Sequence, residues 1–274
     1  MNVYLTLTLV GIGFGGAFFS GLLGIGGAII LIPLLMYVPK ALGVGALDMQ
    51  AITGMTMVQV LFAALSGYFF HKKNNTVSSS LVVTMGISII IGSLLGSVLS
   101  KSMTGEWLKA IFAFLAAVAA VMMFIPRKEE EKVAAVAMGN GGEATAIYYA
   151  DTVSFNKPLA AVIALIVGIL AGMVGAGGAF ILIPLMLYVL KIPTRIAVGS
   201  SLAIILFSAA AGAVGKLSTG QIPLMDSMAL VVGAIPGAQF GGVFGKRVKV
   251  KTLRLMLAVI ISLTAVKMWL EILG

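Results

Sequence analysis

The chain has 274 residues, of which 60% are hydrophobic and only 10% are charged, and its mean hydropathy is +1.14. A soluble domain of this size cannot bury so much apolar surface, so lipid must solvate most of the chain. The net charge of +9 comes from basic residues in short loops, which are typical topology signals and lack the interleaved aromatic residues of a nucleic-acid surface. The absence of Cys excludes disulfides and thiolate chemistry.

The long apolar runs predict the fold class. A hydrocarbon core of about 30 Å takes about 20 helical residues to cross, and these runs reach that length without the alternation of barrel strands. Backbone groups in lipid must be paired within the segment, which favours helices. We therefore expect an all-α polytopic membrane protein. The first segment is expected to be retained, because residues 1–4 carry no basic charge and no small-residue cleavage pattern follows.

The first unit, residues 1–126, begins with a broken apolar stretch at 3–38 and continues with runs at about 47–70, 79–100 and 106–125. Neighbouring glycines disfavour a helix, so the cluster Gly24, Gly26 and Gly27 breaks the first stretch before Ala28. The stretch is either one kinked helix or two short helices that meet at the glycines. Residues 127–156 are polar, have no spanning run, and are predicted to form a linker outside the bilayer.

The second unit, residues 157–274, repeats the first. Residues 171–189 match residues 20–38 at 12 of 19 positions, including four glycines, one proline and one tyrosine. Such self-similarity predicts a duplicated structural unit. The second broken stretch, 157–191, contains Gly175, Gly177 and Gly178 before Ala179, and further runs follow at about 194–215, 222–245 and 251–273.

The basic residues predict that the two units are inverted. If each broken stretch is a hairpin, each unit has about five segments, and the second unit enters the membrane upside down. One side of the membrane then receives all 18 basic residues except Lys40, Lys101, Lys109, Lys216 and Lys267. The positive-inside rule favours this inverted arrangement, with both termini on the non-cytoplasmic side.

The glycine breaks are candidate anion sites. In the second unit we expect short arms at about 157–171 and 178–191, with a turn at 172–178 inside the membrane. Irregular backbone survives at that depth only within protein or around a wet cavity. The helices that restart at Ala28 and Ala179 would direct free N–H groups and their positive dipole ends to the centre. The alternative for spaced glycines is close helix packing, which we favour for Gly92, Gly96, Gly237 and Gly241.

These breaks, each followed by an apolar run that ends in Ile-Pro-Leu, resemble the TauE/SafE sulfite exporter family, also called the 4-toluene sulfonate uptake permeases. The segments AITGMT (51–56) and AVGSSL (197–202) resemble the paired small-hydroxyl segments of that family. The resemblance implies a bacterial or archaeal inner-membrane carrier for sulfite, sulfonates or related organic anions. The two hydroxyl segments differ in sequence, so the halves of the site are not expected to be identical.

Polar residues inside membrane segments are candidates for substrate binding, with helix-to-helix hydrogen bonding as the alternative. Besides Gly24, Gly26, Gly27, Ala28, Gly175, Gly177, Gly178 and Ala179, the candidates are Thr53, Thr56, Gln59, Ser200, Ser201 and Gln239. A buried amide in lipid needs a partner, so Gln59 and Gln239 are both expected to face the bundle.

We interpret the chain as a secondary carrier for a small anion. The paired half-helices suit a passive anion channel equally, and a non-transporting membrane scaffold is a third alternative. It contains no HExxH motif, no nucleophile with a nearby base, and no strand before GIGGA that would indicate a dinucleotide fold. We therefore expect no enzyme activity, no cofactor and no nucleic-acid partner. No acidic residue lies clearly in mid-membrane, so a coupling ion such as H⁺ or Na⁺ is not identified, and a homodimer stays an open alternative.

Overall fold

A computed structural model of the chain describes residues 3–23, 28–72, 77–124, 155–245, 259, 262–263 and 266–271. These residues form helices and short connections and contain no strand. The predicted all-α class is therefore confirmed for the described part of the chain. The first glycine cluster, the linker and most of the run at 251–273 lie outside the described residues.

The helices of the first unit follow the predicted runs closely. A short 3-10 helix, η1, extends the second long run by one turn. The elements in chain order are α1 (Val3–Leu23), α2 (Ala28–Ala41), α3 (Met49–Lys72), α4 (Ser79–Leu99), η1 (Ser100–Ser102) and α5 (Gly105–Phe124).

The second unit repeats this order after the linker. Its first helix begins at a conventional N-cap, because the side chain of Asn156 accepts a hydrogen bond from the Leu159 amide at 3.2 Å and Pro158 stands in the first turn. The described elements are α8 (Lys157–Val174), α9 (Ala179–Tyr188), α10 (Thr194–Ser218) and α11 (Leu224–Gly245).

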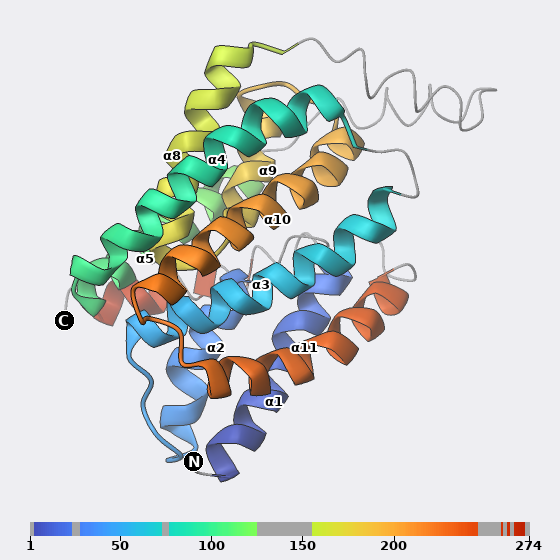
Figure 1. Cartoon of the computed structure of the whole chain (residues 1–274). Coiled ribbons are helices and arrows are strands. Elements are labelled where there is room, and N and C mark those ends of the chain that lie inside the picture. The colour runs from blue at the N-terminus through green and yellow to red at the C-terminus, as the bar shows by residue number, and fades with distance from the viewer. Residues whose placement is uncertain are drawn as a thin grey trace.

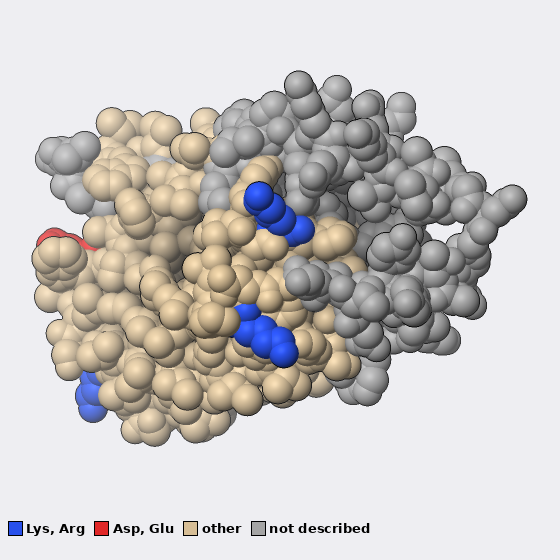
Figure 2. Space-filling model, turned by 90° about the horizontal axis from the view of Figure 1, so that it is seen from above, with Lys and Arg blue, Asp and Glu red and all other residues tan. Residues whose placement is uncertain are grey.

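Several helices are long and apolar enough to cross a membrane. Within the described residues these are 79–102, 157–174, 199–218 and 224–241. On the face drawn in Figure 2, most of the described surface carries no Lys, Arg, Asp or Glu. Large apolar side chains such as Ile87 and Val232 are more than half exposed, as expected where lipid is the solvent.

The two units exchange helix partners across the bundle. Helix α4 of the first unit packs along α8 of the second, and α11 of the second packs along α1 of the first. The helices α3 and α10, which correspond in the predicted repeat, pack on each other, and Figure 1 shows them side by side and running in opposite directions, as α4 and α11 also do. Opposite directions are compatible with an inverted repeat. The inversion of the units and their orientation in a membrane stay predictions.

Glycines allow these helix pairs to approach closely. A Cβ atom added at Gly96 would lie 2.7 Å from the carbonyl carbon of Ile169 on α8, and one added at Gly92 would meet the backbone of the same helix. On the other pair, a Cβ atom at Gly237 would lie 2.9 Å from the Cα of Phe14 on α1. Small residues at such crossings let backbones touch. The packing role predicted for Gly92, Gly96 and Gly237 is confirmed.

Candidate functional site

The second glycine break is a tight left-handed turn between α8 and α9. Gly175, Gly177 and Gly178 have φ angles of 76°, 62° and 81°, a region that side chains other than Gly disfavour. The amides of Gly175 and Ala176 both donate to the carbonyl of Ala171, at 2.8 and 3.1 Å, and so end α8. Three left-handed residues explain why this segment requires glycine at these positions.

The two arms of the break are unequal, which corrects our expectation of two short arms. Helix α8 continues to Val174 and has 18 residues, so it is about 27 Å long. Helix α9 has only 10 residues, or about 15 Å. The predicted turn began at Gly172, but Gly172 is helical and faces α4, where an added Cβ atom would meet the backbone of Ser93. Its small size serves helix packing and does not end the helix.

The break packs against both α3 and α10, which also contact each other. Gly175 packs on the backbone carbonyl of Thr53 in α3. A Cβ atom at Gly177 would lie 2.7 Å from a methyl group of Val60 in α3 and 3.3 Å from one of Ile205 in α10. Residues 171–178 are all buried. The break is therefore irregular backbone enclosed by protein, as such depth requires.

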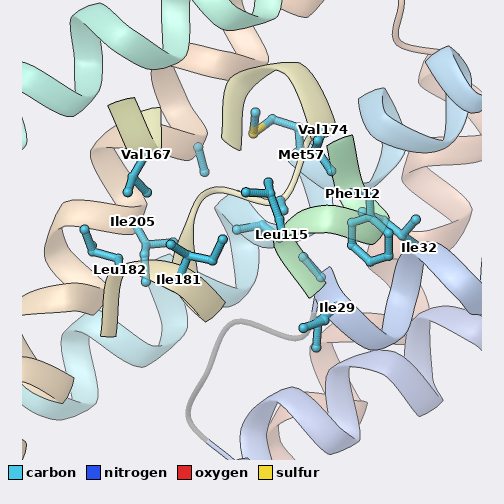
Figure 3. Packing of buried hydrophobic residues seen from close by; sticks show 14 of the residues in the cluster. Ile29, Ile32, Met57, Phe112, Leu115, Val167, Val174, Ile181, Leu182 and Ile205 are labelled. Atoms are coloured by element: carbon cyan, nitrogen blue, oxygen red, sulfur yellow. The ribbon is translucent and has the colours of Figure 1, made fainter. Parts of the chain in front are cut away.

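The start of α9 is closed by apolar side chains in this conformation. A Cβ atom at Gly178 would lie 3.0 Å from Val167 and 3.3 Å from Ala171, and Figure 3 shows Val167, Ile181 and Leu182 in this part of the core. The cavity beside Gly178 has room for only about 10 Å³, scarcely one water molecule. In this conformation the cavity beside the start of α9 is too small for an anion.

The predicted hydroxyl residues are fully buried, with 0% exposure at each of Thr53, Thr56, Ser200 and Ser201. Thr56 donates to the carbonyl of Ile52 at 2.7 Å, which is local helix bonding. Ser200 accepts the amide of Ser78 at 2.9 Å and so joins α10 to the connection before α4. For Ser200, the alternative of bonding between elements describes the observed contact.

Gln59 differs from the other candidates because its amide is unpaired. Its side chain is 0% exposed, and neither its oxygen nor its nitrogen has a hydrogen-bond partner within the described part of the chain. The hydroxyl of Ser208 on α10 is also buried without a partner there. Gln59 adjoins Val60, and Ser208 follows Ile205 by one helical turn, so both orphan groups belong to the helices that enclose Gly177. Such groups are rare in folded proteins and call for a partner.

Lys216 is a candidate functional residue that the sequence analysis missed. The predicted run ended at residue 215, whereas α10 continues to Ser218 and holds Lys216 in its last turn with 0% exposure. Its ammonium nitrogen lies 3.0 Å from the hydroxyl of Thr53, 2.9 Å from that of Ser100, 3.2 Å from the carbonyl of Met173 and 3.2 Å from the amide oxygen of Gln221. In the sequence, the only feature that could have indicated a buried lysine is that apolar and small residues flank Lys216.

Other candidates lie apart from this group. Gln239 is exposed on α11, so our expectation that it faces the bundle is wrong: the face of α11 that carries Gly237 packs on α1. Ala28 is buried with 1% exposure at the start of α2. Ala179 is the first residue of α9. Gly24, Gly26 and Gly27 lie outside the described residues.

Polar side chains buried around a broken helix, in a bundle that lipid solvates, are typical of membrane transporters. Comparison with known proteins identifies the family. Residues 9–268 match the family described as Sulfite exporter TauE/SafE, so the chain belongs to that family.

Similar proteins carry transporter names. The chain is 25% identical to the probable membrane transporter protein YunE of Bacillus subtilis (strain 168) over 252 residues, which cover 89% of this chain and 90% of that protein. It is 28% identical to a probable membrane transporter protein of Xylella fastidiosa (strain 9a5c), with 87% and 85% covered. No solved structure matches the chain. The chain is thus a multi-pass membrane protein of a transporter family.

Proposed function

We propose that this protein is a secondary carrier for a small anion, such as sulfite, an organosulfonate or a related sulfur-containing or organic acid. The anion binds between the two units, at the glycine breaks. Family membership supports transport as the general function. The chemical features around the second break support the anion: a buried lysine, buried hydroxyls, and the first turn of α9 with its positive dipole end.

The observation that carries the proposal is the unpaired amide of Gln59. Leaving a buried donor or acceptor unsatisfied costs about 1–3 kcal/mol. Both polar atoms of Gln59 are in that state within the described part of the chain. Gln59 stands on α3 beside Val60, which contacts the break. An oxyanion or a water molecule can accept a hydrogen bond from the amide N–H group of Gln59. An apolar side chain would fill the same space without the cost of unpaired polar atoms, so packing alone does not explain a glutamine at this position.

The narrow space beside the second break fits a carrier in an occluded state. This space holds only about 10 Å³ and its lining is apolar. An occluded conformation is one state of an alternating-access cycle, in which one unit moves against the other. Placement in the inner membrane, H⁺ or Na⁺ coupling and assembly as a homodimer are further parts of this proposal.

Binding tests the proposal with the purified protein. Sulfite, methanesulfonate and thiol-containing acids should each be added while thermal unfolding is followed. A ligand stabilises by RT ln(1 + [L]/Kd), which is about 2.7 kcal/mol at 100 times Kd. We expect Gln59→Met to be at least as stable as the wild type, because an apolar side chain of similar shape replaces unpaired polar atoms, and to lose anion-dependent stabilisation.

Gln50→Met is the matched control. It makes the same change on the same helix, at a residue whose amide already donates to the carbonyl of Met103 at 3.0 Å. It should keep the wild-type response to anions. Stabilisation of the Gln59→Met variant equal to that of the wild type would remove Gln59 from the site, and a wild type that none of these anions stabilises would contradict the proposed substrate class.

A further inference from the structure

Lys216 is a buried positive group without a negative partner. Of the Lys and Arg side chains that the structure describes, it alone is buried. All four of its hydrogen-bond partners are neutral oxygens. The ion pair formed in the described residues, Lys109 with Glu271 at 3.5 Å, does not involve it. Buried charges in proteins are normally paired with an opposite charge.

The neutral ligands explain how the protein holds this ammonium group. Met173 lies in the last turn of α8, Ser100 directly follows α4, and Lys216 itself lies in the last turn of α10. Helix C-termini carry partial negative charge and stabilise cations. The Met173 carbonyl and the Ser100 hydroxyl, at two of these ends, lie within hydrogen-bond distance of the ammonium nitrogen. They supply partial charges only, so no full negative charge within the described residues balances the ammonium group.

Lys216 and its hydrogen-bond partners are also connected to the second break. The carbonyl of Met173, which accepts from Lys216, precedes Gly175 by two residues. Gly175 packs on the carbonyl of Thr53, whose hydroxyl accepts from Lys216 at 3.0 Å. The remaining partner, Gln221, stands in the connection between α10 and α11 and also donates to the carbonyl of Ser97 at 3.0 Å. The break and Lys216 are thus linked through both Met173 and Thr53.

We propose that Lys216 is the counter-charge of the transported anion, and that the anion replaces the amide oxygen of Gln221 as a ligand of the ammonium group during the transport cycle. The inference rests on the proposed function and narrows its substrate class. A single buried ammonium group balances one negative charge, so the protein selects monoanions over uncharged molecules of the same shape. The monoanion methanesulfonate and the uncharged molecule methanesulfonamide, which has a similar shape, allow this comparison.

Gln221→Glu tests this directly. The substitution places a carboxylate at hydrogen-bond distance from Lys216, keeps the shape of the side chain and keeps an acceptor oxygen for the ammonium group. The built-in carboxylate would neutralise the ammonium group and compete with the anion. The same change removes the Nε2 donor to the carbonyl of Ser97 and the hydroxyl of Thr219, so the melting temperature without ligand is measured first to show that the variant folds. We expect the affinity for methanesulfonate to fall by about tenfold or more, in line with close charge pairs at interfaces.

Gln50→Glu is the matched control for charge. Gln50 lies in the first turn of α3, where the helix dipole favours a carboxylate, and its side chain donates to the carbonyls of Lys101 and Met103 without contacting Lys216. This variant should bind methanesulfonate like the wild type. If Gln221→Glu does not fold, the double variant Lys216→Met with Gln221→Met replaces both partners by apolar groups, which is better tolerated than removing one. It should also lose methanesulfonate binding.

The outcomes separate the two proposals. Methanesulfonate binding in the wild type with tenfold loss in Gln221→Glu, or in the double variant, supports the counter-charge. Unchanged methanesulfonate affinity in a folded Gln221→Glu or double variant overturns it and leaves Lys216 as a structural link. Equal affinity of the wild type for methanesulfonamide overturns it as well. A wild type that binds none of sulfite, methanesulfonate and the thiol-containing acids overturns the proposed function itself.

Discussion

The close approach of α4 and α8 gives a stability prediction with an internal control. Gly96 and Gly86 lie on the same helix, but an added methyl group would meet different surroundings. At Gly96 the new Cβ atom would lie 2.7 Å from the carbonyl carbon of Ile169 and 2.9 Å from its Cα. At Gly86 its nearest neighbour would be a ring carbon of Phe207, at 3.4 Å.

The magnitudes follow from these distances. Backbone atoms of α8 cannot turn aside, so Gly96→Ala must push the two helices apart by roughly 1 Å, and overpacking of this kind costs about 1–3 kcal/mol. At Gly86 the contact is ordinary and the side chain of Phe207 is 43% exposed, so it can adjust. Gly86→Ala should instead stabilise the helix by about 0.5–1 kcal/mol, because alanine loses less backbone entropy than glycine.

Thermal unfolding of the two purified variants in one detergent measures the difference. At about 2–4 °C per kcal/mol for a chain of this size class, Gly96→Ala should melt several degrees below the wild type and Gly86→Ala slightly above it. Equal melting temperatures for the two variants, or a larger loss for Gly86→Ala, would refute the packing geometry assigned to α4 and α8.

The remaining predictions concern topology, the linker and the break. A reporter fused after Gly274 and one inserted near His71 should report opposite sides of the membrane; two cytoplasmic signals would contradict the inverted arrangement. Deletion of residues 129–143 should leave folding and transport largely intact, because this polar stretch has no spanning run, and loss of the folded protein would show that it packs as a structural element. Gly178→Leu should abolish anion binding and, because Gly178 has a φ of 81° and packs on Val167, should also lower the melting temperature, whereas Gly96→Leu should lower yield and melting temperature while the folded fraction still binds the anion. Normal binding by Gly178→Leu would exclude the break from the site.

The sequence predicted the helices because lipid constrains them strongly, whereas the inverted duplication stays a prediction. The runs at 47–70, 79–100 and 106–125 lie within two residues of the observed helices α3, α4 and α5 at both ends, apart from the final 3-10 turn after α4. The second glycine break also falls where adjacent glycines indicated it. Segment length and backbone pairing in a bilayer leave few alternatives, so composition alone carries this information.

The burial and contacts of single residues were harder to predict. Gly172 reads as part of the break, yet it is helical, and its lack of a side chain lets α4 and α8 pack closely. Gln239 is exposed although it lies within an apolar segment. Lys216 reads as a loop residue beside Ser218 and Thr219, whereas three of its four ligands, on Thr53, Ser100 and Met173, come from elements distant in sequence. Contacts between distant segments decide these positions, and local sequence does not contain them.

Uptake of labelled sulfite into liposomes that contain the purified protein tests the central claim most directly. The vesicles should be loaded with unlabelled sulfite or left empty, and protein-free vesicles serve as the blank. A carrier whose site lies between the two units should give saturable uptake. Internal sulfite should accelerate this uptake, because the binding site then carries unlabelled sulfite outward when it returns to the external side. Uptake that rises without saturation and ignores internal sulfite, or uptake equal to that of protein-free vesicles, would contradict the account.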